Sequence, residues 1–268
     1  MGGKRKKRRF TVAPLRKCWA KLASLPRPAQ AALATVAAVA LAFGLNWAYQ
    51  VVRKPAELFF PLSGALSKTP AETWRQYGPI FRQHATDIVA PELLAALAQA
   101  EGSGNPVAQT YWRWQLTAAP TEIYRPASSA VGMYQITNGT FDEARRLCIH
   151  GHQVVEEGRW NDWRSCWFNG LYMRVVPSHA AEMTSAFLHR RATEALERSR
   201  TAHATPRQKQ DLAAVIHLCG ASAGLEFARR KYRARPGQRC GDHELERYLE
   251  KVNKLAQLFL RYSRAGDA

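Results

Sequence analysis

No aspartate or glutamate occurs before Glu57, although the 268-residue chain carries 21 of them. Ten of the 39 lysines and arginines fall before residue 28, six of them in the run KRKKRR at 4–9, so much of the net charge of +18 lies at the N-terminus. The rest of the chain has 29 basic against 21 acidic residues, a modest excess. No aromatic residues interleave with the basic run, as they do in segments that stack nucleic-acid bases. We therefore expect no nucleic-acid partner, and we interpret the run as a determinant of membrane topology.

Residues 29–52 contain no charge of either sign. As a helix, these 24 residues would measure roughly 36 Å at about 1.5 Å each, enough to span a bilayer with some tilt. The basic residues before them place the N-terminus in the cytoplasm. The sequence thus predicts a basic cytoplasmic head at 1–28, a transmembrane helix at 29–52, a tether at 53–68 and an exported domain at 69–268. A cleavable signal peptide is the alternative, although the basic leader is long and no convincing cleavage site follows the span.

The exported part lacks any alternating apolar and polar pattern of useful length, and it contains no internal repeat. Thr69 and Thr205 each open a capping box, which predicts a helix start. We therefore expect an all-α fold of one compact domain, in which only residues 110–124 leave room for a small hairpin. Beyond the helix at 69–89, helices are expected from Asn138 and at about 178–198, 205–219, 221–233 and 242–262.

Cysteine is scarce, with one residue before the apolar span and four after it. Cys18 lies on the side that the cytoplasm keeps reduced, whereas disulfides are permitted on the exported side. Four cysteines allow three pairings. We favour the sequential pairs, because each would close a loop next to a helix end. These candidate disulfide residues are Cys148, Cys166, Cys219 and Cys240.

A metal site is the alternative use of the first two exported cysteines. Cys148, His150, His152 and Cys166 together offer two thiols and two imidazoles. The Cys-x-His-x-His spacing is not a usual one for zinc. We therefore favour the disulfide and expect neither a metal nor a cofactor.

The stretch PELLAALAQAEGSGNP at 91–106 organises the rest of the prediction. Pro91 suits the first position of a helix, and Leu93, Leu97 and Glu101 then share one face. Gly102 and the residues after it stop that helix. A carboxyl group thus ends an apolar face, and burial would favour the protonated form that a general acid needs near neutral pH. A solvated glutamate beside a turn is the alternative.

A second motif, PASSAVGMYQIT at 126–137, follows some twenty-five residues later. Together the two motifs resemble the lytic transglycosylase family of the goose-type lysozyme superfamily. That family carries a Glu-Ser-x-x-Asn-Pro-like segment and then a small-residue turn ending Gly-x-x-Gln-Ile. Gly102 departs from the serine that the family usually has there. The matching residues are Glu101, Asn105, Pro106, Ala130, Gly132, Gln135 and Ile136, and the resemblance covers about residues 69–220.

The resemblance implies a lysozyme-like helical domain, with the helices after 220 as an addition, and a reaction on peptidoglycan. Glu101 would protonate the glycosidic oxygen between N-acetylmuramic acid and N-acetylglucosamine. It would then accept the proton of the C6 hydroxyl, so that a 1,6-anhydro ring closes without a second catalytic carboxylate, unlike in paired-acid glycosidases. Glu122 is the one later acid that remains a candidate partner. The implied location is the periplasmic face of the inner membrane, with glycan strands as the partner.

Further site residues follow from the resemblance. Ser128 or Ser129 stands where the family places a hydroxyl facing the sugar, and Gln135 matches the glutamine that lines the cleft. Tyr134 replaces a family Met or Phe, which favours a packing role. The family's Ala-Tyr-Asn-Ala-Gly signature, whose tyrosine contacts the catalytic carboxylate, is reduced to its glycine in residues 216–220. His217 would take the tyrosine's place or serve as a core histidine.

Two other functions stay open beside the enzyme. One is a non-catalytic glycan-binding scaffold, and the other is an accessory wall-opening component of an envelope assembly, whose protein partners the sequence does not name. An open groove holding Glu101, Gln135 and a hydroxyl would favour the enzyme. Aromatic residues are expected either to stack on sugars or to pack in the core. They are Trp112, Trp114, Trp160, Trp163, Trp167 and Tyr172.

Overall fold

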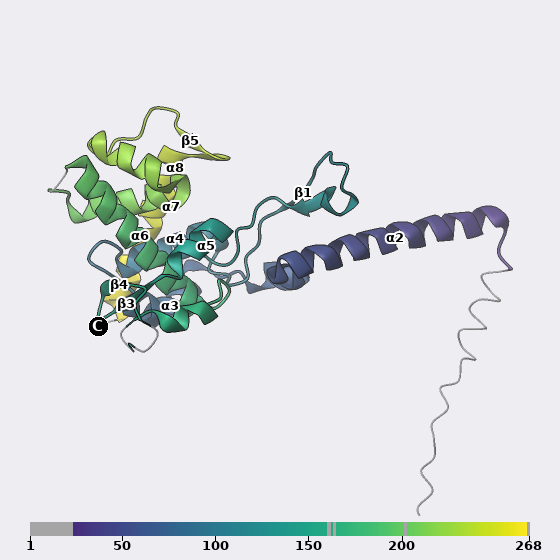
Figure 1. Cartoon of the computed structure of the whole chain (residues 1–268), viewed down its shortest axis with the longest axis horizontal. Coiled ribbons are helices and arrows are strands. Elements are labelled where there is room, and N and C mark those ends of the chain that lie inside the picture. Colours follow the sequence, from purple (N-terminus) through teal and green to yellow (C-terminus); the bar gives the residue numbers. More distant parts are fainter. Residues whose placement is uncertain (1–23, 160–161, 163–164, 201–202, 267–268) are drawn as a thin grey trace, which may run out of the picture.

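The structure is a computed structural model that describes residues 24–159, 162, 165–200 and 203–266. Most of the basic head predicted at 1–28 lies outside the described residues, as do Cys18, Trp160 and Trp163. The described chain is mostly helical, as predicted, with a long helix that extends away from a compact helical body (Figure 1).

That long helix is α2 (Arg27–Arg53), which contains the predicted span 29–52. It is long and apolar enough to cross a membrane, and the most apolar part of it has no buried residue. α7 (Pro206–Arg229) passes the same test of length and composition, but 44% of its apolar window is buried in the body, as in a core helix. After α2 the chain forms 3₁₀ turns, η1 (Pro55–Leu66), where the sequence predicts a tether.

The helical body begins at the predicted capping box of Thr69, and Thr205 opens α7 in the same way. α5 begins at Asn138, one residue earlier than a cap at Asn138 would allow, because Thr137 provides the cap. α7 bends at Gly220, where φ is +81°, so the two helices predicted around that glycine form one bent element. The remaining helices are α3 (Pro70–Gln83), α4 (Pro91–Gly102), α5 (Asn138–Ala144), α6 (Pro177–Ser199) and α8 (Leu245–Gly266).

α4 lies at the centre of the core. Each of its residues from Leu93 to Ala98 is at most 1% exposed. Three of these six are alanines, which let α3, α6 and α8 pack closely around the helix. The largest fully buried side chains around it include Phe81, Tyr134 and Phe259. The last residues of α4 are therefore held firmly by the surrounding helices.

Three antiparallel hairpins modify the all-α expectation. The first overlaps the stretch 110–124 that the sequence left open and ends two residues beyond it, but the other two were not predicted. In the second, Gly151 and His152 both have positive φ, as in a type I′ turn, and Gly-His is a weak signal for that turn. The hairpins are β1 (Trp112–Trp114) with β2 (Tyr124–Pro126), β3 (Leu147–His150) with β4 (Gln153–Glu156), and β5 (Arg239–Cys240) with β6 (His243–Glu244), and the short 3₁₀ helices are η2 (Pro120–Glu122) and η3 (Trp167–Leu171).

Both predicted cysteine pairs lie at disulfide distance, with Cα atoms 5.5 Å apart for Cys148–Cys166 and 5.3 Å apart for Cys219–Cys240. The first pair joins β3 to the residue before η3, and the second joins α7 beside its bend to β5. Because the sulfur atoms of Cys148 and Cys166 bond to each other, they are not available as the thiolate ligands of the alternative metal site.

Candidate active site

Glu101 occupies the last turn of α4, on the face that Leu93 and Leu97 bury. Its side chain is 15% exposed, so the carboxylate is largely enclosed yet reaches solvent at one side. Ser103 adopts the left-handed conformation that ends the helix, with φ of +50°. The buried helix-end carboxylate predicted from 91–106 is therefore present.

The second motif folds against the segment that follows α4. The N–H of Gly132 donates to the carbonyl of Ala108 at 2.8 Å, and Val131 forms bridges with Gln109 and Ile136. Gly132 has φ of +82°, and a Cβ there would lie 2.4 Å from the carbonyl oxygen of Arg174. This position therefore needs glycine, and the turn it allows carries Gln135 to the same cavity as Glu101.

Gly102 is explained by the same packing. A Cβ at Gly102 would lie 2.8 Å from the Cα of Met133 and 3.1 Å from the Cβ of Ala108. The end of α4 and the Gln135 turn thus approach too closely for a serine at position 102. Serine is the residue that the transglycosylase motif usually has at this position. The departure from that motif is a consequence of close backbone packing.

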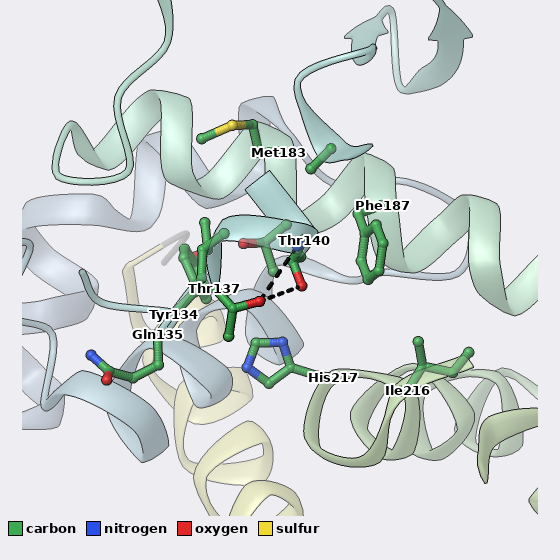
Figure 2. Close-up of a pocket in the computed structure, with 12 residues that line it drawn as sticks. Tyr134, Gln135, Thr137, Thr140, Met183, Phe187, Ile216 and His217 are labelled. Carbon is green, nitrogen blue, oxygen red and sulfur yellow. Dashed lines mark hydrogen bonds between the residues drawn. The ribbon is translucent and has the colours of Figure 1, made fainter. Parts of the chain in front are cut away.

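Two cavities meet at Gln135. The larger has a volume of about 620 Å³, and Glu101 and Thr110 are among the residues that line it. The smaller, of about 200 Å³, lies between α5, α6 and α7 and combines apolar side chains with the hydroxyls of Thr137 and Thr140 (Figure 2). Gln135 lines both cavities, so it lies between the recess that Glu101 lines and the one that His217 lines.

Tyr248 of α8 is the hydrogen-bond partner of the Glu101 carboxylate. Its hydroxyl donates to Oε1 of Glu101 at 2.7 Å. Burial, the charge of Glu101 and this hydrogen bond all raise the pKa of Tyr248 well above its usual value, so the phenol keeps its proton. His217 lies nearby, with Nε2 at 3.8 Å from the same oxygen, and burial lowers its pKa more than Glu101 raises it. The carboxylate thus faces a neutral donor and a neutral imidazole.

α8 and the β5–β6 hairpin form the opposite side of the larger cavity. Lys251 donates to the carbonyl of Ala100 at 2.8 Å and so satisfies one of the free carbonyls at the end of α4. The Cys219–Cys240 disulfide ties this side to α7, two residues after His217. The charged residues that line this side are Arg239, Asp242, Glu244, Arg247 and Lys251.

The structure brings together only some of the residues predicted for the site. Gln135 has a left-handed backbone with φ of +48°, and its side-chain nitrogen donates to the carbonyls of Ala108 and Gly132. Tyr134 is fully buried, in agreement with a packing role. His217 lies next to Glu101, as the sequence suggested.

Ser128 and Ser129 require a correction, because neither lines either cavity. The hydroxyl of Ser128 accepts the N–H of Ala130, and that of Ser129 accepts the N–H of Asn138. Both hydroxyls thus stabilise the turn itself, as serine side chains often do. Hydroxyls from Thr110, Thr137 and Thr140 line the cavities in their place.

Other candidates face away from the cavity. Glu122 forms ion pairs with Arg53 and Arg125, so it is bound beside α2 and not beside Glu101. Trp112 and Trp114 pack on Tyr124, also on the α2 side. Tyr172 donates to the buried Glu182, with its pKa raised by burial and by that carboxylate, and stacks on His179. These residues have structural roles here.

Tyr248 is the main functional residue that the sequence did not reveal. Leu245, Tyr248 and Val252 recur at helical spacing and mark a buried face of α8, which was a usable signal for packing. That spacing does not predict which carboxylate the phenol contacts, because Glu101 lies 147 residues earlier in the sequence. A search of known protein families and of characterised proteins finds no match to this sequence.

Proposed function

We propose that this chain is a membrane-anchored lytic transglycosylase that cleaves the β-1,4 bond between N-acetylmuramic acid and N-acetylglucosamine in peptidoglycan. One observation carries the proposal: an enclosed carboxylate, Glu101, opens into a cavity beside Gln135 and holds a hydrogen bond from Tyr248. An occluded carboxylate would have favoured the non-catalytic scaffold. We infer that Tyr248 takes the place of the tyrosine in the family's Ala-Tyr-Asn-Ala-Gly signature, of which this chain keeps only the glycine.

The reaction follows from a single proton-transferring group. Protonated Glu101 gives its proton to the glycosidic oxygen, and the bond to C1 of the muramic acid breaks as N-acetylglucosamine leaves. The resulting carboxylate accepts the proton of the C6 hydroxyl on the same muramic acid, whose oxygen bonds to C1. Attack by a group already attached to the substrate gains from proximity and needs no activated water. The Tyr248 hydroxyl orients the carboxylate through both transfers.

The smaller cavity supports sugar binding next to the reacting bond. Phe187, which is partly exposed, offers apolar surface on which the apolar face of a sugar can pack, and Thr137 and Thr140 offer hydroxyls (Figure 2). Thr184, which also lines this cavity, has a buried hydroxyl without a hydrogen-bond partner. Apolar walls with a few polar groups are typical of ligand sites.

The larger cavity supports an anionic substrate. Three cations, Arg239, Arg247 and Lys251, line it against the acids Glu101, Asp242 and Glu244. Glu244 accepts from Arg247 at 3.0 Å, which partly neutralises that pair. Peptidoglycan carries carboxylates on its lactyl groups and stem peptides, and guanidinium groups bind carboxylates well. We assign this side of the groove to the peptide-bearing strand.

The location is part of the same proposal. We take α2 to be an uncleaved anchor whose basic N-terminal side stays in the cytoplasm, with the helical body in the periplasm of a Gram-negative cell. Asn46 and Gln50 of α2 donate to backbone carbonyls of the body at 2.7 Å each. Removal of α2 with a signal peptide would leave both carbonyls without these partners.

The product of the reaction tests the proposal. Purified protein incubated with peptidoglycan sacculi should release fragments ending in 1,6-anhydro-N-acetylmuramic acid, each lighter by one water than its hydrolytic counterpart. A hydrolase is the second candidate, because Asp242 and Glu244 line the same cavity and either carboxylate would serve to position a water. Reducing-end muramic acid that disappears in Asp242→Asn or Glu244→Gln would establish the hydrolase. Absence of any cleavage by the folded protein would contradict both.

A further inference from the structure

The β1–β2 hairpin carries three exposed apolar side chains, among them Leu116, the most exposed large apolar residue of the described chain. Leu116 is fully exposed, Trp114 is 66% exposed and Ile123 is 39% exposed. The tip of the hairpin, residues 114–123, reads WQLTAAPTEI and carries one charge, on Glu122, which forms ion pairs with Arg53 and Arg125. None of the three apolar side chains lines either cavity at the candidate active site. A water-exposed apolar tip of this kind calls for a partner.

The hairpin is docked along the last turns of α2. The side chains of Asn46 and Gln50 donate to the carbonyls of Tyr124 and Thr121, both at 2.7 Å. The Phe43 ring meets the Trp114 and Tyr124 rings edge-on, with centroids 6.1 and 6.3 Å apart. Phe43 to Arg53 spans roughly 15 Å of helix. Figure 1 shows that the hairpin and α2 extend from the same side of the helical body.

This part of α2 coincides with the outer boundary of a bilayer. The 27 residues of α2 would measure about 40 Å, whereas a hydrocarbon core is about 30 Å thick. The helix therefore extends beyond the core, and its polar and amphipathic residues show where. Asn46, Trp47, Tyr49 and Gln50 all lie in its last turns, and Trp and Tyr are enriched at membrane interfaces. A hairpin bound beside these residues lies at the depth of the lipid headgroups.

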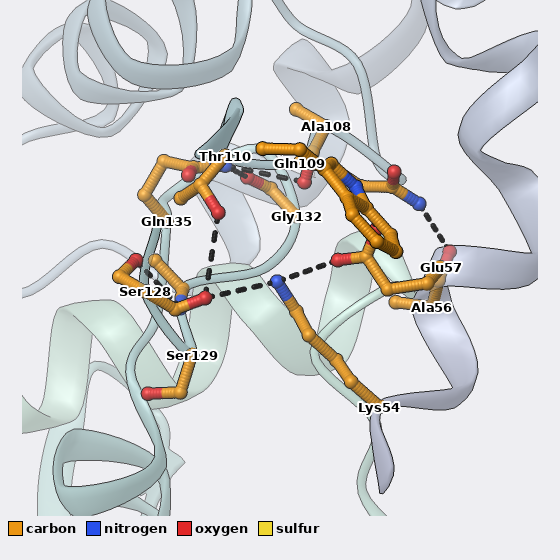
Figure 3. Close-up of polar contacts among 12 residues, drawn as sticks. Lys54, Ala56, Glu57, Ala108, Gln109, Thr110, Ser128, Ser129, Gly132 and Gln135 are labelled. Carbon is orange, nitrogen blue, oxygen red and sulfur yellow. Dashed lines mark hydrogen bonds and ion pairs between the residues drawn. The ribbon is translucent and has the colours of Figure 1, made fainter. Parts of the chain in front are cut away.

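The base of the hairpin is fixed to the chain that follows α2. Lys54 forms an ion pair with the fully buried Glu57 at 2.8 Å and donates to the carbonyl of Ser128 at 3.2 Å (Figure 3). The indole N–H of Trp112 donates to Glu57 at 2.9 Å, and Gln109 donates to the carbonyl of Ala56. These contacts join the hairpin, η1 and the exit of α2 into one unit.

The same hairpin also reaches the candidate active site. Gln109, Thr110 and Tyr111 lead into β1, and all three line the larger cavity beside Glu101. One continuous segment therefore has its base at the cavity and its tip beside the outer end of α2.

We propose that the β1–β2 hairpin is a membrane-interface element: its tip inserts Trp114, Leu116 and Ile123 among the lipid headgroups next to α2. The partner is the lipid surface of the membrane that α2 crosses. This inference rests on the anchor role of α2 but not on the reaction at Glu101. Its consequence is that the cavity is held at a fixed height and orientation above the membrane, so that it meets the glycan strands nearest to the bilayer.

The test places an environment-sensitive fluorophore on the tip. Leu116→Cys in a Cys18→Ser background gives one reactive thiol, because the other four cysteines are paired. The full chain is reconstituted in nanodiscs of phosphatidylcholine and phosphatidylglycerol. Lys254→Cys, on a side chain that is 74% exposed in α8, is the matched control. A second tip position, Thr117→Cys, guards against a local effect of the label.

We expect blue-shifted emission from both tip labels, strong quenching by lipids with a spin label near the headgroup, and protection from aqueous iodide. The control should show the reverse. Iodide quenching of the tip labels equal to that of the control would overturn the proposal, and failure of the chain to incorporate into discs would overturn it together with the anchor. A tip label shielded from iodide and lipid quenchers alike would indicate a protein contact and would also overturn it. Sacculus cleavage is scored separately, so the two proposals fail independently.

Discussion

The cavity beside Glu101 has two walls that are built differently. The near wall, residues 101–111 and 130–136, comes from two segments close in the sequence and is joined by backbone hydrogen bonds. The far wall, residues 239–251, comes more than a hundred residues later. One helix face, one disulfide and two side-chain contacts from Tyr248 and Lys251 hold the far wall to the rest. In the proposed reaction, the near wall supplies the proton-transferring group, Glu101, and the far wall supplies the Tyr248 contact that orients it.

The largest expected effect belongs to the near wall alone. Glu101→Gln removes the proton donor and acceptor but keeps a group that accepts from Tyr248. Fragment release from sacculi should fall about 10²- to 10⁴-fold, the usual contribution of a general acid or base. Glu92→Gln, at the other end of α4, is the control and should retain activity. Turnover that survives in Glu101→Gln would move the chemistry to another acid, such as Asp242.

Loss of the far-wall disulfide, Cys219–Cys240, should weaken the attachment of the far wall to the rest of the body. The Cys219→Ser/Cys240→Ser double variant should lose about 3 kcal/mol of unfolding free energy, as expected for a closed loop of this length, and also most of its sacculus cleavage. The Cys148–Cys166 disulfide closes a loop of similar length away from the cavity. The Cys148→Ser/Cys166→Ser double variant removes it and should lose a comparable unfolding free energy. Its cleavage rate, measured well below its melting temperature, should stay near that of the parent protein. Equal rates for the two variants would show that the disulfide does not hold the wall.

Removal of the Tyr248 hydroxyl tests the hydrogen bond that joins the two walls. Tyr248→Phe removes one hydrogen bond to a carboxylate, worth about 1.5–3 kcal/mol, so cleavage should fall roughly 10- to 100-fold. A purely structural role would lower stability and leave the cleavage rate of the folded protein unchanged. Tyr262→Phe, on the same helix, is the matched control.

A smaller effect should come from the near wall's close packing. Gly102→Ser restores the residue expected from the transglycosylase motif, but its Cβ would meet the backbone of Met133. Overpacking of this kind costs about 1–3 kcal/mol, which denaturant unfolding would measure. Gly139→Ser, at a position with open space around the Cβ, should be close to neutral. An unchanged midpoint in Gly102→Ser would mean that the two segments of the near wall separate easily.

The smallest effect concerns pH. Burial lowers the pKa of His84, His189 and His217 more than Glu182, Asp87 and Glu101 raise it. In the unfolded chain these histidines titrate near 6.5, so below that pH the unfolded state binds more protons and stability falls. Above about 6.5 the full stability is present. Thermal unfolding from pH 7.5 to 5.5 should show this decline, and His217→Gln should flatten it. A melting temperature that rises toward pH 5.5 would contradict the assignment.

Much of the near wall was predictable because local rules determine it. The helix bounds of α4, the stop after Gly102 and the glycine at 132 follow from caps, turns and periodicity within a few residues. The hydroxyls of Ser128 and Ser129 were assigned to the substrate, but both accept hydrogen bonds from backbone N–H groups of the turn. The sequence of a turn does not show whether a serine hydroxyl bonds to the backbone or to a ligand. The short hairpins escaped prediction for a similar reason, since two- to four-residue strands carry too few positions for a pattern.

The far wall was less predictable because its role depends on a long-range contact. Periodicity identifies the buried face of α8 but not its neighbour. The pairing of Cys219 with Cys240 was predicted because it would close a loop next to a helix end, and the structure places the two cysteines at disulfide distance. The hydrogen bond from Tyr248 to Glu101 spans 147 residues and leaves no local mark in the sequence.

That separation also sets the order in which the site is assembled. The Tyr248 phenol reaches Glu101 only after α8, the helix that packs most extensively on α4, has been synthesised and has docked. Contacts between distant segments form late, because closing a long loop costs entropy before the contact repays it. A nascent chain, or one cut before residue 245, therefore carries an unoriented carboxylate. Under the proposed function, only a chain that has been synthesised and folded through α8 has the oriented carboxylate that cleavage requires.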